Sequence, residues 1–500
     1  MRARRPGGEG SAPPLSRRGE ARAFGRRVLD LGLAFGAARR RAWSGAGVAE
    51  LERRFDRPIP ERGRPAAQVL RHLERDIAAH SMPMAHPRLF GLFTPAPLPI
   101  AAFAELAAAF LNQSPDAWKA GPAATEIEKR LVRLFTESIG WRRGAFGVFT
   151  SGGGMANLMA LKMARDRALG IGVRRRGLGR RATRLRVYAS DQAHFSIGRA
   201  LDLLGLGDRT LVRIATGTDR RLAPERLEAA MRRDRRRGLV PMAVVATAGT
   251  TNTGTLDPLA AIAEACGRAG VFLHVDAAYG GALLLSTGHR ARLAGIEQAD
   301  TVTVDPHKWL FQPFSLGGLF ARDRAALHAA FVTEPDYLRK DLEAERDRLD
   351  FYQYSIEGSR PFRGLKLWLT LQLHGRAGLG ALVDRTMAVA AHLERQVAAD
   401  PAFEASGAAA DLASLCFRYR PRWSRRPGRG GGAADRRRLD AAQRALQQEV
   451  ERRGFAWFPT VRMGNAVWLR FGVFNHRTTP RDVDDVLAHL KRVAADLGIG

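Results

Sequence analysis

The chain has 500 residues, of which 45% are hydrophobic, so it is long enough to bury the cores of two domains. Its formal net charge is +30, and only 7 of its 80 basic residues are lysines. The arginine clusters lack a nucleic-acid fold motif and the arginine bias runs through the whole chain, so we expect solvated surface rather than nucleic-acid binding.

Two cysteines, Cys266 and Cys416, provide neither a disulfide framework nor the spacing of a metal site. No apolar stretch approaches the roughly 20 residues that a membrane span requires. The composition therefore predicts a soluble protein with no metal, in the reducing cytoplasm. An arginine-rich, acid-poor start is also typical of an organelle transit peptide, but the same bias continues along the chain and favours the cytoplasm.

The first 120 residues predict two segments outside the main fold. Residues 1–50 are rich in Arg, Gly and Pro and predict a mobile segment, within which 24–43 could form an amphipathic helix. Residues 51–120 contain a helical stretch and then the proline-punctuated stretch 87–99. We interpret 51–120 as an N-terminal arm.

Strands and helices alternate from residue 121 to residue 375, which predicts a large α/β domain around a mostly parallel sheet. Residues 376–500 predict a smaller α+β domain. It is expected to begin with a helix at 379–398 and end with a helix at 480–497, with strands at 415–419 and 466–471 between them. A low-complexity, arginine-rich loop is expected at 425–438.

A candidate phosphate cradle comes first along the large domain. Residues 149–154 read Phe-Thr-Ser-Gly-Gly-Gly and precede a helical pattern at 155–167. Glycines at a helix N-terminus let backbone N–H groups approach an anion, which the helix dipole also favours. Three glycines alone are a weak signal, and no Gly-Lys-Ser/Thr follows to make a P-loop.

Three later apolar strands each end on polar residues. The strand at 242–246 runs into a hydroxyl-rich turn at 247–251, the strand at 271–275 ends at Asp276, and the strand at 301–304 leads to Asp305, His307 and Lys308. Chemistry in an open parallel sheet gathers beyond the carboxyl ends of its strands. The sequence therefore predicts a site at this edge.

Lys308 is a candidate for covalent chemistry. In a chain that uses arginine almost wherever a positive charge suffices, a lysine in the run Pro-His-Lys-Trp at 306–309 suggests a task that arginine cannot perform. A lysine amine can condense with an aldehyde to a Schiff base, whereas guanidinium cannot. Taken without its surroundings, the His-Lys pair at 307–308 is more simply interpreted as carrying a surface or capping lysine. The neighbouring acid and the glycine turn favour the covalent role instead.

A phosphate cradle, a Schiff-base lysine and an acid together indicate pyridoxal 5'-phosphate. The sequence resembles the group II pyridoxal-phosphate-dependent amino-acid decarboxylases, which include the aromatic-amino-acid, glutamate and 2,4-diaminobutyrate enzymes. The resemblance extends from about Met82 to about Leu490 and rests on eight motifs in the family's order, at 86–90, 125–128, 150–153, 191–196, 249–251, 274–279, 306–309 and 362–368.

The resemblance implies an aminotransferase-type (fold type I) large domain and a role for each matching residue. Lys308 would hold the cofactor as an internal aldimine, and Asp276 would face the pyridine nitrogen. His194 would stack on one face of the ring, with Ala278 packed against the other. Further cofactor contacts are implied for Ser151, Gly152, Gly153, Thr251 and His307. Capping for Asp276 and a core or surface position for His194 are the non-functional alternatives.

The family's proton donor is a tyrosine on a loop expected here at 337–359. Counting back without gaps from the motif at 363–366 puts that position on Phe351, whereas a shift of one residue puts it on Tyr352. We favour Tyr352 and a decarboxylase. Loss of the hydroxyl at Phe351 would instead allow reaction with oxygen, as in an aldehyde synthase, and Tyr354 also lies within reach.

The resemblance therefore implies decarboxylation of an L-amino acid to an amine and carbon dioxide, through an external aldimine and a quinonoid, in a homodimer whose arm (86–99) contributes to the partner's pocket. Another fold type I lyase or an aminotransferase would share Lys308 and Asp276. A basic nucleic-acid-binding protein is the remote alternative. The substrate side chain stays open, since Phe90, Phe93 and Trp118 could line an aromatic pocket and the many arginines could suit an acidic one.

Overall fold

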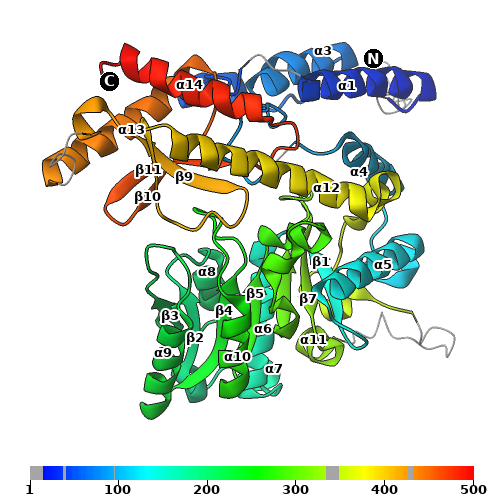
Figure 1. Cartoon of the computed structure of the whole chain (residues 1–500). Coiled ribbons are helices and arrows are strands. Elements are labelled where there is room, and N and C mark those ends of the chain that lie inside the picture. The colour runs from blue at the N-terminus through cyan, green and yellow to red at the C-terminus, as the bar shows by residue number, and fades with distance from the viewer. Residues whose placement is uncertain (1–14, 38–40, 95, 334–347, 426–431, 500) are drawn as a thin grey trace, which may run out of the picture.

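The computed structural model describes residues 15–37, 41–94, 96–333, 348–425 and 432–499. Its larger part is built on a seven-stranded sheet with the order β1-β7-β6-β5-β4-β2-β3 (Figure 1). The strands are β1 (Phe146–Thr150), β2 (Leu185–Ser190), β3 (Leu211–Ile214), β4 (Val240–Thr247), β5 (Phe272–Asp276), β6 (Thr301–Val304) and β7 (Gly317–Ala321). The predicted α/β fold with a mostly parallel sheet is confirmed.

The pairing of the strands explains their composition. β2 pairs in parallel with β3 and β4, and β5 pairs in parallel with β4 and β6, whereas β7 runs antiparallel to both β6 and β1. Every residue of β5 and β6 is buried, as expected where helices cover both faces of a sheet. The three strands that end on polar residues are direct neighbours, so their carboxyl ends lie side by side.

Helices flank this sheet. They are α5 (Pro122–Ile139), α6 (Gly153–Leu169), α7 (Val173–Arg176), α8 (Ser196–Leu203), α9 (Pro224–Arg236), α10 (Leu259–Ala269) and α11 (Arg324–Phe331). Of these, α6 contacts β1, β4, β5, β6 and β7. Its many small residues, such as Ala156 and Ala160, are fully buried and allow close packing on the sheet. The N-terminus of α6 is thereby held near the carboxyl ends of the central strands.

The smaller part is an antiparallel sheet with the order β10-β11-β9-β8, covered by long helices (Figure 1). Its elements are β8 (Phe403–Ala405), β9 (Ser414–Tyr419), β10 (Thr460–Met463), β11 (Ala466–Gly472), α12 (Gly364–Ala399), α13 (Ala433–Arg453) and α14 (Pro480–Asp496). Thr479 and Asp482 form a capping box that begins α14. The helix α12 is interrupted at Gly375, whose φ of +67° suits glycine best.

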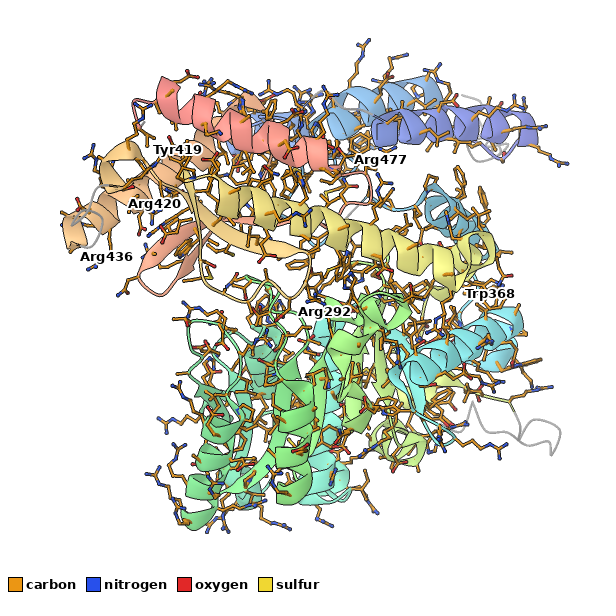
Figure 2. The ribbon with its side chains drawn as sticks, in the orientation of Figure 1. Arg292, Trp368, Tyr419, Arg420, Arg436 and Arg477 are labelled. Atoms are coloured by element: carbon orange, nitrogen blue, oxygen red, sulfur yellow. The ribbon has the colours of Figure 1, made fainter. Side chains whose placement is uncertain are left out.

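The two parts meet along α12. Figure 2 shows Arg292 at this boundary, where its guanidinium donates to the carbonyl of Asp411 at 2.9 Å. Arg436 lies at the outer end of α13 in the same view. Because α13 begins at Ala433, the predicted loop at 425–438 was wrong for its last residues. Arginine is a good helix former, so the run Arg436 to Arg438 does not interrupt a helix.

The N-terminal residues form α1 (Arg18–Ala37), α2 (Val48–Phe55), α3 (Ala66–His72) and α4 (Pro99–Leu111). The amphipathic helix suggested at 24–43 thus begins and ends earlier, while residues 1–14 and 38–40 lie outside the described residues. Within the described helices, none combines the length and apolar character needed to cross a bilayer.

Candidate active site

A cavity of about 140 Å³ lies where β4, β5 and β6 end. It is lined by Phe93, Gly153, Gly154, Asn157, His194, Thr247, Gly249, Thr251, Asp276, Ala278, Tyr279 and Lys308. Six of these residues were expected from the sequence, namely Gly153, His194, Thr251, Asp276, Ala278 and Lys308. The structure therefore brings together residues that lie up to 155 positions apart between Gly153 and Lys308.

Lys308 lies in the turn that follows β6. Its backbone N–H donates to the carbonyl of Asp305 at 2.9 Å, which closes the turn. Its Nζ lies 3.2 Å from Asp305 Oδ2 and 6.0 Å from the centre of the Phe93 ring. The amine is therefore held by one buried carboxylate while it still lines the cavity.

Asp276 ends β5 and is 6% exposed. Its Oδ1 accepts from the backbone N–H of Ala278 at 3.1 Å, and its Oδ2 accepts from Asn157 Nδ2 at 2.8 Å. Two donors on two different segments fix the plane of the carboxylate. An acid held in this way can present negative charge to a cationic ring nitrogen.

The glycine turn forms the N-terminus of α6, where Gly153 and Gly154 line the cavity. The first N–H groups of a helix have no carbonyl partner within it and can bind an anion. A Cβ on Gly153 would lie 2.9 Å from Asp305 Oδ2 and 3.0 Å from Ala278 Cβ, so a larger residue does not fit. Ser151 and Gly152 precede these residues in the same turn, and Ser151 is exposed.

Two histidines lie at the site. Burial lowers the pKa of both His194 and His307, so both rings are neutral near pH 7. His307 Nδ1 accepts from the backbone N–H of Leu316 at 2.9 Å, and its Nε2 is 3.7 Å from Asp305 Oδ2. His307 thus supports the turn around Lys308 and does not itself line the cavity.

Asn157 and Arg470 are site residues that the sequence interpretation missed. Asn157 is, with Asp166, one of two buried polar residues on the otherwise apolar buried face of α6, a signal that could have been noticed. Arg470 is 5% exposed on β11 and donates to the carbonyl of Thr251 at 2.6 Å and to that of Gly91. Its guanidinium also lies 5.1 Å from the Phe93 ring, so the small sheet helps to build the cavity.

The segment 88–93 reaches the cavity because it pairs with the smaller part of the same chain. The N–H of Phe90 donates to the carbonyl of Trp457 at 2.8 Å, and the N–H of Gly472 donates to Phe90 at 2.7 Å. A Cβ on Gly91 would lie 2.0 Å from the Trp457 ring. This pairing places Phe93 in the cavity of its own chain, and a contribution of the segment to a partner's pocket stays a prediction.

Phe90 and Trp118, which were candidates for a substrate pocket, do not line the cavity. Phe90 is fully buried and stacks on Phe471 at 4.7 Å. The backbone N–H of Trp118 donates to Asp350 at 2.8 Å. Of the three predicted aromatic residues, Phe93 alone is positioned to meet a ligand there.

Tyr352 also lies away from the cavity in its own chain. It belongs to the short helix Phe351–Tyr354, in which Phe351 stacks on Phe146 at 5.8 Å. Phe146 begins β1, and the other end of that strand, Thr150, is the end nearest the glycine turn. Five strand residues separate the two ends by roughly 13 Å. Tyr337 lies outside the described residues.

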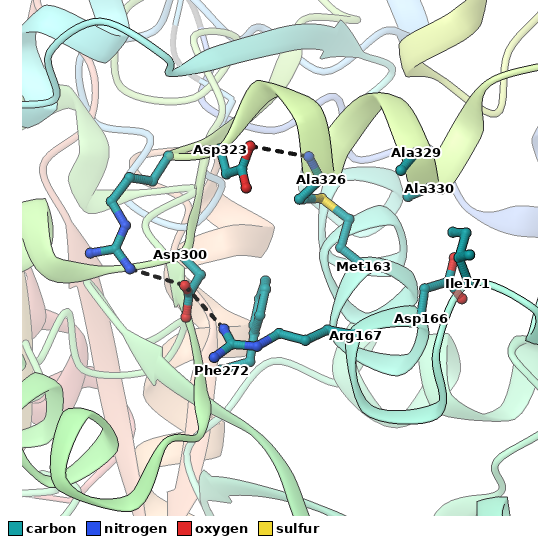
Figure 3. Close-up of a pocket in the computed structure, with 11 residues that line it drawn as sticks. Met163, Asp166, Arg167, Ile171, Phe272, Asp300, Asp323, Ala326, Ala329 and Ala330 are labelled. Carbon is teal, nitrogen blue, oxygen red and sulfur yellow. Dashed lines mark hydrogen bonds and ion pairs between the residues drawn. The ribbon is translucent and has the colours of Figure 1, made fainter.

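A larger pocket lies elsewhere. It has a volume of about 600 Å³ and surrounds Asp300, Arg167 and Phe272, at the amino ends of β5 and β6 (Figure 3). Arg167 and Arg322 both pair with Asp300, at 3.3 and 3.1 Å. The pocket contains none of the residues expected for catalysis.

The cavity fits pyridoxal phosphate. An unpaired helix N-terminus, a glycine that leaves no room for a Cβ, a carboxylate held by two donors and a lysine amine together provide the groups that this cofactor requires. With the sheet order described above, they define a fold type I pyridoxal-phosphate enzyme.

Comparison with known proteins narrows this class to one family. Residues 49–420 match the model described as the pyridoxal-dependent decarboxylase conserved domain, and the chain belongs to this family. It is accordingly an amino-acid decarboxylase, a carboxy-lyase with pyridoxal 5'-phosphate as its cofactor.

The most similar proteins include two bacterial enzymes. An aromatic-L-amino-acid decarboxylase from Bacillus atrophaeus is 32% identical over 450 residues, which cover 90% of each chain. An L-2,4-diaminobutyrate decarboxylase from Rhizobium meliloti is 33% identical over 441 residues, covering 88% of this chain and 84% of the relative. A crystal structure of Oryza sativa TDC with PLP and tryptamine superposes with a TM-score of 0.88 at 28% identity and covers 98% of this chain and 100% of that one.

Proposed function

We propose that Lys308, Asp276 and His194 form the catalytic centre of this decarboxylase. When bound, pyridoxal phosphate supplies an aldehyde for covalent attachment and an electron-withdrawing ring that accepts the electron pair left as carbon dioxide departs. Lys308 would hold the aldehyde carbon through Nζ until an amino acid displaces it. Asp276 would keep the ring nitrogen protonated, and His194 would cover one face of the ring.

Other residues in and next to the cavity would bind the cofactor and orient it. The N–H groups of Gly153 and Gly154, with Ser151 and Gly152 before them, would hold the phosphate. Thr251 would contact the cofactor, with its carbonyl anchored by Arg470. Ala278 would pack against the other ring face, and His307 would support the lysine turn.

The convergence of Lys308 and Asp276 in one cavity is the observation that supports this proposal best. The experiment that tests it is a panel of amino acids assayed together for carbon dioxide, amine, aldehyde and peroxide. Carbon dioxide released from at least one amino acid, in a reaction that needs added pyridoxal phosphate, is the expected result. Transamination without carbon dioxide would contradict the proposal.

For the substrate we favour an amino acid with an aromatic side chain. Phe93 lines the cavity, and its ring packs on Tyr279 at 4.9 Å and Phe474 at 4.5 Å, so that the cavity has an aromatic wall. The similarity to an aromatic-amino-acid enzyme supports this choice, while the similarity to a diaminobutyrate enzyme favours a cationic substrate. The same panel distinguishes the two.

Tyr352 is our candidate for the proton donor that yields an amine. Its position far from Lys308 means that it must serve a second copy of the chain or approach by rearrangement of 348–359. Tyr352→Phe should shift the product from amine towards aldehyde and peroxide, while carbon dioxide release changes less. Tyr354→Phe, which removes a hydroxyl bonded to Arg324 at 3.0 Å, is the matched comparison.

Two outcomes would change this assignment. If the unmodified enzyme already consumes oxygen and makes aldehyde, Phe351 occupies the donor position and the chain is an aldehyde synthase. If Tyr352→Phe still gives a clean amine product, then another group, such as Tyr354 or a water molecule, returns the proton.

We also propose that the protein is a homodimer in the cytoplasm. Four large apolar residues of α4, namely Phe103, Leu106, Phe110 and Leu111, are exposed, and Phe110 is 84% exposed. An apolar face of this kind is typical of a surface that another chain covers. Light scattering should give twice the mass of one chain, and an active monomer at working concentration would contradict the dimer.

A further inference from the structure

We propose that Asn157 and Ser196 form a positioning relay that joins Asp276 to His194 and determines which ring nitrogen of His194 holds the proton. The inference rests on the proposed function, because it concerns two side chains assigned to the cofactor. It adds Ser196 to the site, gives Asn157 a role in it, and assigns a hydrogen-bonding state to His194.

Asn157 is the centre of the relay. It is 1% exposed, and its Nδ2 donates to Asp276 Oδ2 at 2.8 Å and to Ser196 Oγ at 3.0 Å. Its Oδ1 accepts from Thr303 Oγ1 at 2.9 Å. A carboxylate can only accept hydrogen bonds, so the amino group of the amide must face Asp276 and the orientation of the amide is determined.

His274 completes the surroundings of Asn157. Its Nε2 lies 3.0 Å from Asn157 Oδ1 and its Nδ1 lies 2.9 Å from Thr301 Oγ1. Full burial lowers the pKa of His274, so the ring is neutral and has one proton, which it donates from Nε2 to the amide oxygen. All four hydrogen-bonding positions of Asn157 are thereby filled, and the residue cannot turn without leaving a buried group unpaired.

Ser196 transmits this arrangement to His194. Its Oγ accepts from Asn157, so its single hydroxyl proton remains for His194 Nδ1, which is 2.8 Å away. The backbone N–H of Ser196 also points at this nitrogen, at 3.3 Å. A backbone N–H can only donate, so Nδ1 is an acceptor and the ring proton lies on Nε2.

The consequence concerns what His194 can do in the cavity. Burial lowers the pKa of the ring, with Lys308 and Arg199 acting in the same direction and Asp276 and Asp305 opposing them. The neutral ring then presents an N–H rather than a lone pair to the cavity that it lines. His194 is therefore a hydrogen-bond donor to an anionic group and not a general base.

The first test uses the full-length protein without cofactor. Nitrogen NMR of ring-labelled histidine, with the His194 signal assigned by its loss in His194→Gln, should show Nδ1 unprotonated and Nε2 protonated near pH 7.5. Ser196→Ala removes the shorter contact to Nδ1 and leaves only the backbone N–H at 3.3 Å, so it should increase the share of the tautomer protonated on Nδ1, whereas Ser196→Thr, which keeps a hydroxyl, should retain the single tautomer. Ser138→Ala removes another buried serine hydroxyl, bonded to the carbonyl of Leu134 at 2.7 Å, and should change nothing at His194.

The second test measures cofactor binding and turnover. Asn157→Ala should raise the Kd for pyridoxal phosphate by roughly ten- to a hundredfold, because it removes a hydrogen bond to a charged group. Ser196→Ala should leave that Kd within about threefold and lower kcat by roughly tenfold. Ser138→Ala should change neither value.

The NMR and binding results together decide whether Asn157 and Ser196 form the relay. A His194 ring protonated on Nδ1, or Ser196→Ala and Ser138→Ala with the same NMR spectrum, would overturn the relay. If Asn157→Ala does not fold, the serine variants decide the question alone. A wild-type protein that binds no pyridoxal phosphate would instead refute the proposed function, while the NMR result would still show whether the relay exists.

Discussion

The pocket around Asp300 and the cavity around Lys308 lie at opposite edges of the central sheet, and they differ in how far their polar groups are paired within the chain. The pocket around Asp300 is several times larger, about 600 Å³ against 140 Å³, but its charges neutralise one another. Asp300 pairs with two arginines and also accepts from the N–H of Leu273 at 2.8 Å. Asp323, on the same pocket wall, caps α11 by accepting from Ala325 and Ala326.

The cavity around Lys308 retains hydrogen-bonding capacity that the chain does not use. The first N–H groups of α6 point out of the helix, and Asp305 Oδ1 is buried with no hydrogen-bond partner in the described chain. Buried polar groups are normally satisfied, so such groups are expected where a ligand completes the set. Unused hydrogen-bonding capacity, rather than volume, distinguishes the proposed active site from the pocket around Asp300.

Replacing Lys308 should cause the largest loss of activity of any single change in the smaller cavity. Lys308→Arg keeps a positive charge beside Asp305 but cannot bond covalently to the cofactor, so decarboxylation should fall by more than about a thousandfold. Reduction of the wild-type holoenzyme with borohydride, followed by peptide mapping, should place the cofactor on Lys308. A label on any of the other six lysines would show that Lys308 does not bind the cofactor.

Asp276→Asn should have the next largest effect. The amide has no negative charge to hold the ring nitrogen protonated, and its amino group must face either Asn157 Nδ2 or the N–H of Ala278, both of which are donors. We expect kcat to fall by roughly a hundredfold, about 3 kcal/mol in the transition state, with part of the cofactor retained. Turnover near the wild-type rate would show that Asp276 is not the partner of the ring.

Acidification should destabilise the fold through histidines inside and outside the cavity alike. Burial lowers the pKa of His194, and that of His476 and His489 to about 4, so the unfolded chain binds more protons below pH 6.5. Stability should therefore fall as the pH drops from 6.5 towards 4, by roughly 1 kcal/mol per pH unit for each of His476 and His489, and His194 should contribute in the same direction.

Urea unfolding of the cofactor-free protein at pH 7 and pH 5 measures this loss. His489→Gln and His194→Gln should each flatten the pH dependence. Asp257 opposes the trend, because burial raises its pKa to about 6 and its protonation favours the folded state as the pH falls. A slope that only His194→Gln reduces would mean that the pH sensitivity belongs to the cavity.

A change in the larger pocket should have the smallest effect. Arg167→Gln leaves Asp300 paired with Arg322, and the Arg167 side chain is 54% exposed. We expect unchanged kcat and KM and a change in the free energy of unfolding of about 1 kcal/mol or less. A large loss of activity in this variant would show that the paired pocket has a function after all.

The local sequence was sufficient for the three strands that end at the cavity, for the glycine turn and for the residues at their ends. β6 begins and ends as the pattern at 301–304 predicts. Asp276 ends one buried strand and Lys308 follows another, and the two strands were expected to be neighbours. Strand ends are read from a few adjacent residues, because apolar runs and turn residues act over short distances.

Only the tertiary structure decided which distant groups meet. Asn157 and Asp276 are 119 positions apart and Arg470 and Thr251 are 219 apart, so no periodicity relates them. The placement of the segment 351–354 beside Phe146, rather than beside Lys308, likewise follows from the packing of aromatic rings on β1. Hydrogen-bond partners of buried polar groups depend on how whole elements pack, and packing is a property of the assembled chain.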